Sequence, residues 1–236
     1  MNDADELGFL TLTGARRGTR FNGPMPPQDD PHADSQVLHA GAPIDEARLV
    51  AVMLHGRGAG AHDILSLAQA FTAPDVAYLA PQAAGNTWYP YSFLMPVEHN
   101  EPALSSALRM IERLIESLAE KQFTHERIAV MGFSQGGCLA LEFAARHAQR
   151  YAAIAAFSGG LIGPPGTSRN FSGSFEGTPV FLGCSDIDPH IPVARVLESA
   201  EIFTRMGAAV NKQIYPQMGH TIIQPEIDIV DALLRA

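Results

Sequence analysis

The sequence predicts an α/β fold in which a mostly parallel central sheet carries helices on both faces. Short apolar runs typical of buried strands alternate with helical patterns, and most of these runs stop at Gly, Pro or polar residues. No internal repeat of about 20–50 residues interrupts this alternation. Because most consecutive strands are separated by helices, right-handed crossovers and a mostly parallel sheet are expected.

The first half of the chain supplies three strands and two helices. Strands are expected at 37–39 and at 48–54, where a nearly continuous apolar run is typical of a strand covered on both faces. A short helix at 64–71 and a strand at 75–80, stopped by proline, come next. Residues 102–121 carry apolar side chains at helical spacing and predict a long helix.

The second half continues the alternation to the end of the chain. The expected strands are 127–132, 151–157, 179–184 and 209–215, and the expected helices are 135–148, 191–206 and a last one from about 224. No linker separates these elements, so we expect one domain over residues 35–236. Residues 1–34 are rich in Pro, Gly and Asp and predict an irregular N-terminal arm.

Composition excludes several classes of function. The chain has 236 residues, 46% of them hydrophobic, and a formal net charge of −9, so a sizeable core is expected and nucleic acid is an unsuitable partner. Two cysteines cannot form a disulfide framework, which favours a reducing compartment. The N-terminus does not resemble a secretory signal, and no apolar run is long enough to span a membrane. We expect a cytoplasmic protein without integral membrane association.

The hexapeptide GFSQGG places Ser134 between glycines, where a strand ends and a helix begins. In this context Gly-x-Ser-x-Gly forces the serine into a strained turn that exposes its hydroxyl at the helix N-terminus. The alternative is a glycine-rich turn in which Ser134 only caps the helix. We favour a nucleophile, because ligands of open α/β sheets bind at the carboxyl ends of parallel strands.

A serine nucleophile needs a base, and the base needs an acid that fixes its tautomer. His220 follows the strand at 209–215, and both Asp186 and Asp188 follow the strand at 179–184. Spacing does not separate the two aspartates. We favour Asp188 because Pro189 holds it in an extended conformation, whereas Asp186 is free to bond turn amides.

Two backbone amides are expected to bind the developing oxyanion. One belongs to Gln135, the residue after the serine, and the other to Arg57 in the glycine-rich loop after the strand at 48–54. A phosphate cradle is the rival for this loop, but the loop matches no phosphate-binding pattern. Gly56 and the aromatic Trp88 are the candidate substrate-binding residues, and ordinary core packing is the alternative for Trp88.

Five motifs in order, LHGRGAGAHD, APQAAGNTWYP, GFSQGGCLALE, SDIDPHIP and MGH, resemble the phospholipase/carboxylesterase family of α/β-hydrolases, which includes acyl-protein thioesterases. The resemblance covers roughly residues 37–236 and implies the α/β-hydrolase fold and the same roles for Ser134, Asp188 and His220. Arg57-Gly58 stands where the eukaryotic thioesterases usually carry Leu-Gly. This difference indicates the bacterial carboxylesterase branch.

We therefore expect a serine hydrolase that cleaves carboxylic esters with short to medium acyl groups, lysophospholipids among the candidates, through an acyl-enzyme. The alternatives are an acyl-protein or acyl-CoA thioesterase and a non-catalytic binding protein. No metal and no organic cofactor is expected. Only about twenty residues separate the strand at 151–157 from the next, so no large lid domain is expected. The sequence leaves the oligomeric state open.

Overall fold

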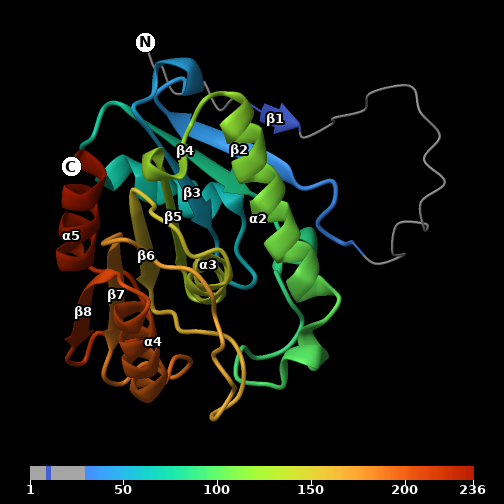
Figure 1. The fold of residues 1–236 in the computed structure, drawn as a ribbon, viewed down its shortest axis with the longest axis vertical. Coiled ribbons are helices and arrows are strands. Elements are labelled where there is room, and N and C mark those ends of the chain that lie inside the picture. The colour runs from blue at the N-terminus through green and yellow to red at the C-terminus, as the bar shows by residue number, and fades with distance from the viewer. Residues whose placement is uncertain (1–8, 12–29) are drawn as a thin grey trace.

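An eight-stranded sheet forms the centre of the molecule (Figure 1). The computed structural model describes residues 9–11 and 30–236. The strands lie in the order β1-β2-β4-β3-β5-β6-β7-β8. Their bounds are β1 Phe9–Thr11, β2 Gln36–Gly41, β3 Leu49–Leu54, β4 Val76–Pro81, β5 Ile128–Phe133, β6 Ala153–Phe157, β7 Pro179–Ser185 and β8 Ala209–Tyr215. The strands from β4 to β8 across the sheet are parallel, while β1 and β2 are antiparallel to their neighbours.

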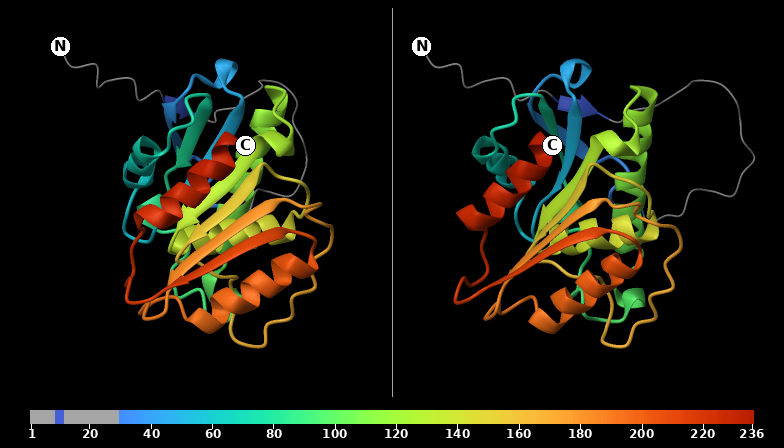
Figure 2. Two further views of the ribbon diagram at one scale, coloured as in Figure 1. Left: turned by 90° about the vertical axis from the view of Figure 1, so that its left-hand side faces the viewer. Right: turned by 60° about the vertical axis from the view of Figure 1, so that its left-hand side comes forward.

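Helices cover both faces of this sheet, which confirms the predicted α/β architecture (Figure 2). One face carries the three helices α2, α3 and α4, and the other carries α1 and α5. Their bounds are α1 Ala61–Ser66, α2 Ala103–Glu120, α3 Gln135–Arg146, α4 Val193–Arg205 and α5 Gln224–Arg235. The helix expected at 64–71 begins three residues earlier and ends as a 3₁₀ turn over Leu67–Ala70.

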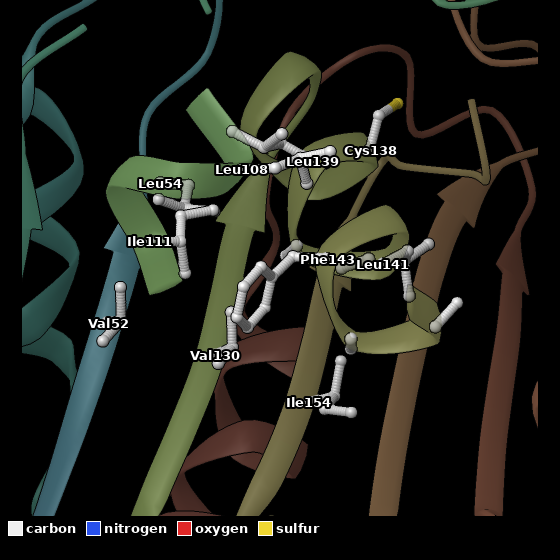
Figure 3. Close-up of a cluster of buried hydrophobic side chains, with 14 of the residues drawn as sticks. Val52, Leu54, Leu108, Ile111, Val130, Cys138, Leu139, Leu141, Phe143 and Ile154 are labelled. Atoms are coloured by element: carbon white, nitrogen blue, oxygen red, sulfur yellow. The ribbon is translucent and has the colours of Figure 1, made fainter. Parts of the chain in front are cut away.

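Alternation along the strands produces two hydrophobic cores. In β3, Val52 and Leu54 face the layer of α2, α3 and α4, whereas Ala51 and Met53 face α1 and α5. Figure 3 shows the first core, in which side chains of α2 and α3 pack on the central strands. Because both faces are covered, every residue of β3 and β4 is buried, as their unbroken apolar runs predict.

The predicted irregular arm over residues 1–34 needs a correction. Residues 9–11 are not irregular but form β1, which pairs with β2 at the edge of the sheet. Three residues are too few to show a period of two, so the sequence pattern gave no strand signal there. Most of the arm lies outside the described residues, and a domain boundary at residue 35 remains a prediction.

The segment just before residue 35 packs on the domain. Asp30 accepts a hydrogen bond from Ser106 of α2 and forms an ion pair with Arg113, with 3.2 Å between nitrogen and oxygen. The His32 ring is buried, and its Nε2 donates to the carbonyl of Trp88 at 3.0 Å. Its Nδ1 accepts the amide of Ala84, which fixes this tautomer. The packed structure therefore begins upstream of β2.

The segment between β6 and β7 contains no helix and no further sheet strand, apart from one isolated bridge to Gly173. This agrees with the expectation that the fold has no large lid domain. None of the helices within residues 30–236 combines the length and apolar character needed to cross a bilayer.

A buried carboxyl group stabilises the start of α5. The Oε2 atom of Glu226 accepts the amide of Ile223 at 3.0 Å, while its Oε1 is buried with no hydrogen-bond partner. Burial raises the pKa of the Glu226 carboxyl to about 7. A Cβ atom on Gly183 would lie 2.0 Å from Oε1, which explains the glycine in β7.

The raised pKa of Glu226 predicts a pH-dependent stability. Between about pH 4.5 and 7 the carboxyl group ionises in the unfolded chain but stays protonated in the folded one. Ionisation therefore favours the unfolded chain, and the free energy of unfolding falls as the pH rises through this range. Glu226→Gln keeps the acceptor for Ile223 and removes the charge. We expect the free energy of unfolding of the variant to exceed that of the wild type by about 2–3 kcal/mol at pH 8 but not at pH 4.5. Urea titrations at both pH values check this, with Glu201→Gln on the exposed face of α4 as control; a gain independent of pH contradicts it.

Candidate active site

The candidate residues follow three strands that end at one edge of the sheet. The strands β5, β7 and β8 are parallel, so the segments after Phe133, Ser185 and Tyr215 emerge on the same side. Ser134 begins the connection to α3, Asp188 lies in the loop after β7, and His220 lies in the loop after β8. The topology therefore brings together residues that are up to 86 positions apart in the sequence.

The turn at Ser134 is strained, and the glycines around it are required by close packing. Ser134 has φ 55° and ψ −118°, a backbone conformation that residues with a side chain rarely adopt. A Cβ atom on Gly132 would lie 2.4 Å from the backbone of Gly136, and one on Gly136 would lie 2.0 Å from the carbonyl oxygen of Leu54. Each glycine of the Gly-x-Ser-x-Gly pattern thus allows α3 to approach the ends of β3 and β5.

The hydroxyl of Ser134 does not cap the helix. No hydrogen bond joins its Oγ to the first turn of α3, which removes the capping alternative. Instead Oγ lies 2.9 Å from Nε2 of His220, and Nδ1 of the same ring lies 2.7 Å from Oδ2 of Asp188. The three side chains form one continuous chain of hydrogen bonds.

The two competing aspartates have different partners. The side chain of Asp188 is fully buried, and its Oδ1 accepts the backbone amides of His190 at 2.8 Å and Ile191 at 3.0 Å, which leaves Oδ2 for His220. Asp186 is exposed and accepts the amide of Gln217 at 2.8 Å, in the loop that carries the histidine. The structure therefore brings Asp188 to His220, and Asp186 supports the neighbouring loop.

The charge of Asp188 determines where the protons lie in the hydrogen-bonded series Ser134, His220 and Asp188. Burial raises the pKa of Asp188, but the hydrogen bonds from His220, His190 and Ile191 outweigh it and hold the pKa below the usual value of 3.8. The carboxylate is thus ionised at neutral pH and accepts the Nδ1 proton of His220. Nε2 then carries a lone pair and accepts the hydrogen bond of the Ser134 hydroxyl.

Aromatic rings hold the imidazole in place. The His220 ring lies 4.9 Å from the ring of Phe133, the residue before the serine, and 4.7 Å from the ring of His190. Sequence reasoning assigned no role to His190. In the structure it forms an edge-on contact with His220 and borders the cleft.

The glycine-rich loop after β3 presents an amide beside Ser134. A Cβ atom on Gly56 would lie 3.6 Å from that of Ser134, so the two segments are in contact. The turns, loops and helix caps of the described residues contain no backbone hydrogen bond in which the amide of Arg57 or Gln135 is the donor. Both amides are therefore free to donate to a bound ligand.

The buried ring of His55 orients the peptide that contains the Arg57 amide. Its Nε2 accepts the amide of Ala83 at 3.1 Å, so the proton resides on Nδ1, which donates to the carbonyl of Gly56 at 2.8 Å. In a trans peptide the N–H points away from the C=O. Holding the Gly56 oxygen therefore aims the Arg57 N–H in the opposite direction. Sequence reasoning missed this role, because it depends on a contact with a residue 28 positions away.

Removing the His55 ring is expected to weaken turnover. In His55→Ala the Gly56–Arg57 peptide loses one of its holding bonds, and we expect kcat for p-nitrophenyl acetate to fall roughly tenfold to a hundredfold with a smaller change in KM. His39→Ala is the matched control, since it removes a half-buried imidazole that bonds the carbonyl of Ala42 at the far side of the sheet. An unchanged kcat in His55→Ala, with the fold intact, contradicts this role.

The prediction that Trp88 lines the substrate pocket is wrong. Its side chain is completely buried and does not border the cleft. The indole Nε1 donates to the carbonyl of His55 at 2.9 Å, so Trp88 lies beneath the glycine-rich loop and supports it. An indole needs a partner for its N–H when buried, and the loop carbonyl supplies that partner.

The side chain of Gln135 joins the loop that contains Trp88 to the turn at Ser134. Its Oε1 accepts the amide of Trp88 at 3.0 Å, and its Nε2 donates to the carbonyl of Tyr89 at 2.8 Å. Sequence reasoning considered only the backbone amide of Gln135. The amide side chain also holds one wall of the site, a function that any residue with one donor and one acceptor of this length would satisfy.

An open cleft of about 500 Å³ lies directly over the serine. It is lined by Gly56, Arg57, Ala59, Pro90, Tyr91, Ser92, Phe133, Ser134, Gln135, His190 and His220. Gly56 lies in this lining, and its binding of a substrate stays a prediction. Tyr91, which the sequence did not single out, is 58% exposed at the rim. The volume suits a small organic substrate.

Neither cysteine is suited to nucleophilic chemistry. Cys138 and Cys184 are both buried, and burial raises the pKa of each thiol to about 12. In the part of the chain that the structure describes, no three His, Cys, Asp or Glu side chains are grouped so as to hold a metal ion. Ser134 is thus the candidate nucleophile of the cleft.

A mostly parallel sheet with a strand-turn-helix serine at its carboxyl edge defines the α/β-hydrolase class. Solved structures share this fold over most of the chain. The chain belongs to the phospholipase/carboxylesterase family, whose sequence profile matches residues 37–236. It is accordingly a serine hydrolase of the carboxylesterase type.

Individual relatives support this assignment. The crystal structure of a phospholipase/carboxylesterase from Dyadobacter fermentans DSM 18053 is 43% identical, covers 86% of this chain and 97% of its own, and superposes with a TM-score of 0.83. Acyl-protein thioesterase 1 of Saccharomyces cerevisiae is 24% identical over 84% of this chain and 96% of its own. Acyl-protein thioesterase 1 of Gibberella zeae is 30% identical over 54% of this chain; the match spans 55% of that relative's length.

Proposed function

We propose that this protein hydrolyses carboxylic esters with short to medium acyl groups, with Ser134 as nucleophile, His220 as general base and Asp188 as the acid that orients it. The observation that carries the proposal is the pair of hydrogen bonds at 2.9 Å and 2.7 Å that links the three side chains. Such a chain activates an alcohol that is otherwise a poor nucleophile at neutral pH.

Acylation follows from the proton positions. Oγ of Ser134 attacks the ester carbonyl while its proton moves to Nε2 of His220, and the carbonyl oxygen becomes an oxyanion. The amides of Arg57 and Gln135 stabilise that oxyanion. The tetrahedral intermediate then breaks its bond to the leaving oxygen, which takes the proton from Nε2 and departs as an alcohol.

Deacylation repeats the sequence with water. His220 takes a proton from a water molecule, the hydroxide attacks the acyl-enzyme carbonyl, and the same two amides stabilise the second oxyanion. Collapse of this intermediate returns the proton from Nε2 to Oγ of Ser134 and releases the carboxylic acid. Neither half requires a metal or an organic cofactor.

The cleft determines which esters fit. Its volume of about 500 Å³ and its open side, where no lid domain covers it, accommodate short and medium acyl chains. Lysophospholipids are a further candidate. Their single acyl chain can extend out of the cleft through its open side, so no enclosed tunnel is needed to hold it.

Thioester hydrolysis is the second candidate function. Several relatives carry the name acyl-protein thioesterase 1, and attack on a thioester carbonyl uses the same three side chains. A panel of p-nitrophenyl esters of rising chain length, acyl-CoA thioesters, lysophospholipids and short peptides separates the candidates. We expect the highest kcat/KM for an ester with an acyl chain of about 2–8 carbons, a length that a cleft of this class can hold. A higher value for thioesters favours the thioesterase, and inertness toward all substrates favours a binding protein.

A further inference from the structure

The cleft over Ser134 is positively charged, although the whole chain carries a net charge of −9. No aspartate or glutamate lines it, and Arg57 is its one lysine or arginine within the described residues. The other titratable side chains of the lining are Tyr91, His190 and His220, none of which belongs to a residue type that is anionic at neutral pH. The charge that a substrate meets in this cleft is therefore that of Arg57.

The guanidinium of Arg57 is fixed in position without being neutralised. Its two terminal nitrogens donate to the carbonyls of Pro90 at 2.7 Å and Tyr91 at 2.5 Å. Both acceptors are uncharged backbone oxygens, and among the described residues no carboxylate lies within ion-pair distance of Arg57. Two of five N–H donors are thus used, and the side chain remains exposed at the cleft.

We propose that Arg57 gives this site a preference for esters that carry a second, anionic group, a carboxylate on either the acyl or the alcohol side of the scissile bond. The inference rests on the proposed ester hydrolysis and names a substrate class for it. The backbone amide of Arg57 would stabilise the oxyanion, while its guanidinium binds the substrate's carboxylate.

Physical chemistry favours a carboxylate as the ligand. The remaining N–H groups of a guanidinium match the two oxygens of a carboxylate, and hydrogen bonds between charged partners are stronger than neutral ones. The two carbonyl contacts already restrict the side chain, so little rotational freedom is lost on binding. Because the cleft is open to water, we expect a preference of about tenfold, near the lower limit for a charged hydrogen bond.

Two substrate pairs test the proposal, each matched for shape. The acyl arm compares mono-p-nitrophenyl adipate with its neutral monoamide, and the alcohol arm compares 4-acetoxybenzoate with 4-acetoxybenzamide. In each arm the ratio of kcat/KM for the anionic ester to that for the neutral one is measured. For the wild type we expect a ratio of about ten in one arm, and that arm tells which side of the bond faces Arg57.

Three variants assign the preference to the charge. In Arg57→Gln the ratio should fall to about one, whereas Arg57→Lys should keep part of it. Arg205→Leu removes the same charge at the end of α4, at the opposite edge of the sheet, and should leave the ratio unchanged. Rising salt should lower the wild-type ratio but not that of Arg57→Gln.

The outcomes separate this inference from the proposed function. If the wild type hydrolyses the neutral esters and its ratio is below two in both arms, or if Arg57→Gln keeps the wild-type ratio, the anionic preference is wrong and the esterase stands. If the wild type leaves all four esters intact, both fail. Because the ratio compares two substrates on one variant, a general loss of activity through a disturbed loop does not affect it.

Discussion

Replacing Ser134 with alanine is expected to lower kcat for p-nitrophenyl esters by about four to six orders of magnitude. The variant loses the oxygen that forms the acyl-enzyme, while the amides of Arg57 and Gln135 still bind the carbonyl. A small residual rate from direct attack by water therefore remains. Alanine fits the strained turn no worse than serine, so the melting temperature should change little.

A second serine of the same cleft provides the control for this experiment. Ser92 lines the cavity and its Oγ accepts the amide of Leu94, but it lies in another loop and forms no bond to His220. Ser92→Ala should stay within about tenfold of the wild-type kcat, since it removes only a contact at the cleft wall. Full activity in Ser134→Ala contradicts the proposed nucleophile.

Changing Asp188 to asparagine is expected to lower kcat by about four orders of magnitude. The carboxylate accepts the Nδ1 proton of His220 at 2.7 Å, whereas an asparagine amide in the same place can donate to Nδ1. The proton would then move to Nε2, and the ring could no longer accept the proton of Ser134. Steady-state kinetics with a neutral ester measure the effect.

Asp186→Asn is the matched control, two residues away on the same loop. Its side chain accepts one backbone amide, that of Gln217, and an asparagine oxygen can do the same. We expect kcat to stay within about threefold of the wild type, as is usual for an exposed substitution that keeps its bond. The reverse ranking of the two variants would show that Asp186 is the functional carboxylate.

Local rules made much of the fold and the site predictable. Strand and helix periods located the parallel sheet and its helices, because each period reflects which faces an element buries. The pattern around Ser134 is partly local, since the clash that requires Gly132 arises with Gly136 in the same turn, whereas Gly136 is required by Leu54 of the neighbouring strand. Chain order then limited the partners to the loops after β7 and β8.

Features that depend on long-range contacts could not be predicted from the sequence. Trp88 was predicted to line the pocket, but an aromatic loop residue can face either the cleft or the core. Only the packed structure shows that Trp88 faces the core. The tautomer of His55 depends on the amide of Ala83, and β1 exists through pairing with β2. Such contacts join segments whose spacing carries no period, so pattern analysis has nothing to detect.

The most direct test of the account is to locate a covalent adduct. The protein is treated with a fluorophosphonate, which reacts with serines activated by a neighbouring base, and the modified peptide is sequenced by mass spectrometry. We expect one adduct per chain, on Ser134, with none in Ser134→Ala and little in Asp188→Asn. An adduct on a different residue, or an unreactive wild type that still hydrolyses esters, would contradict the proposed nucleophile.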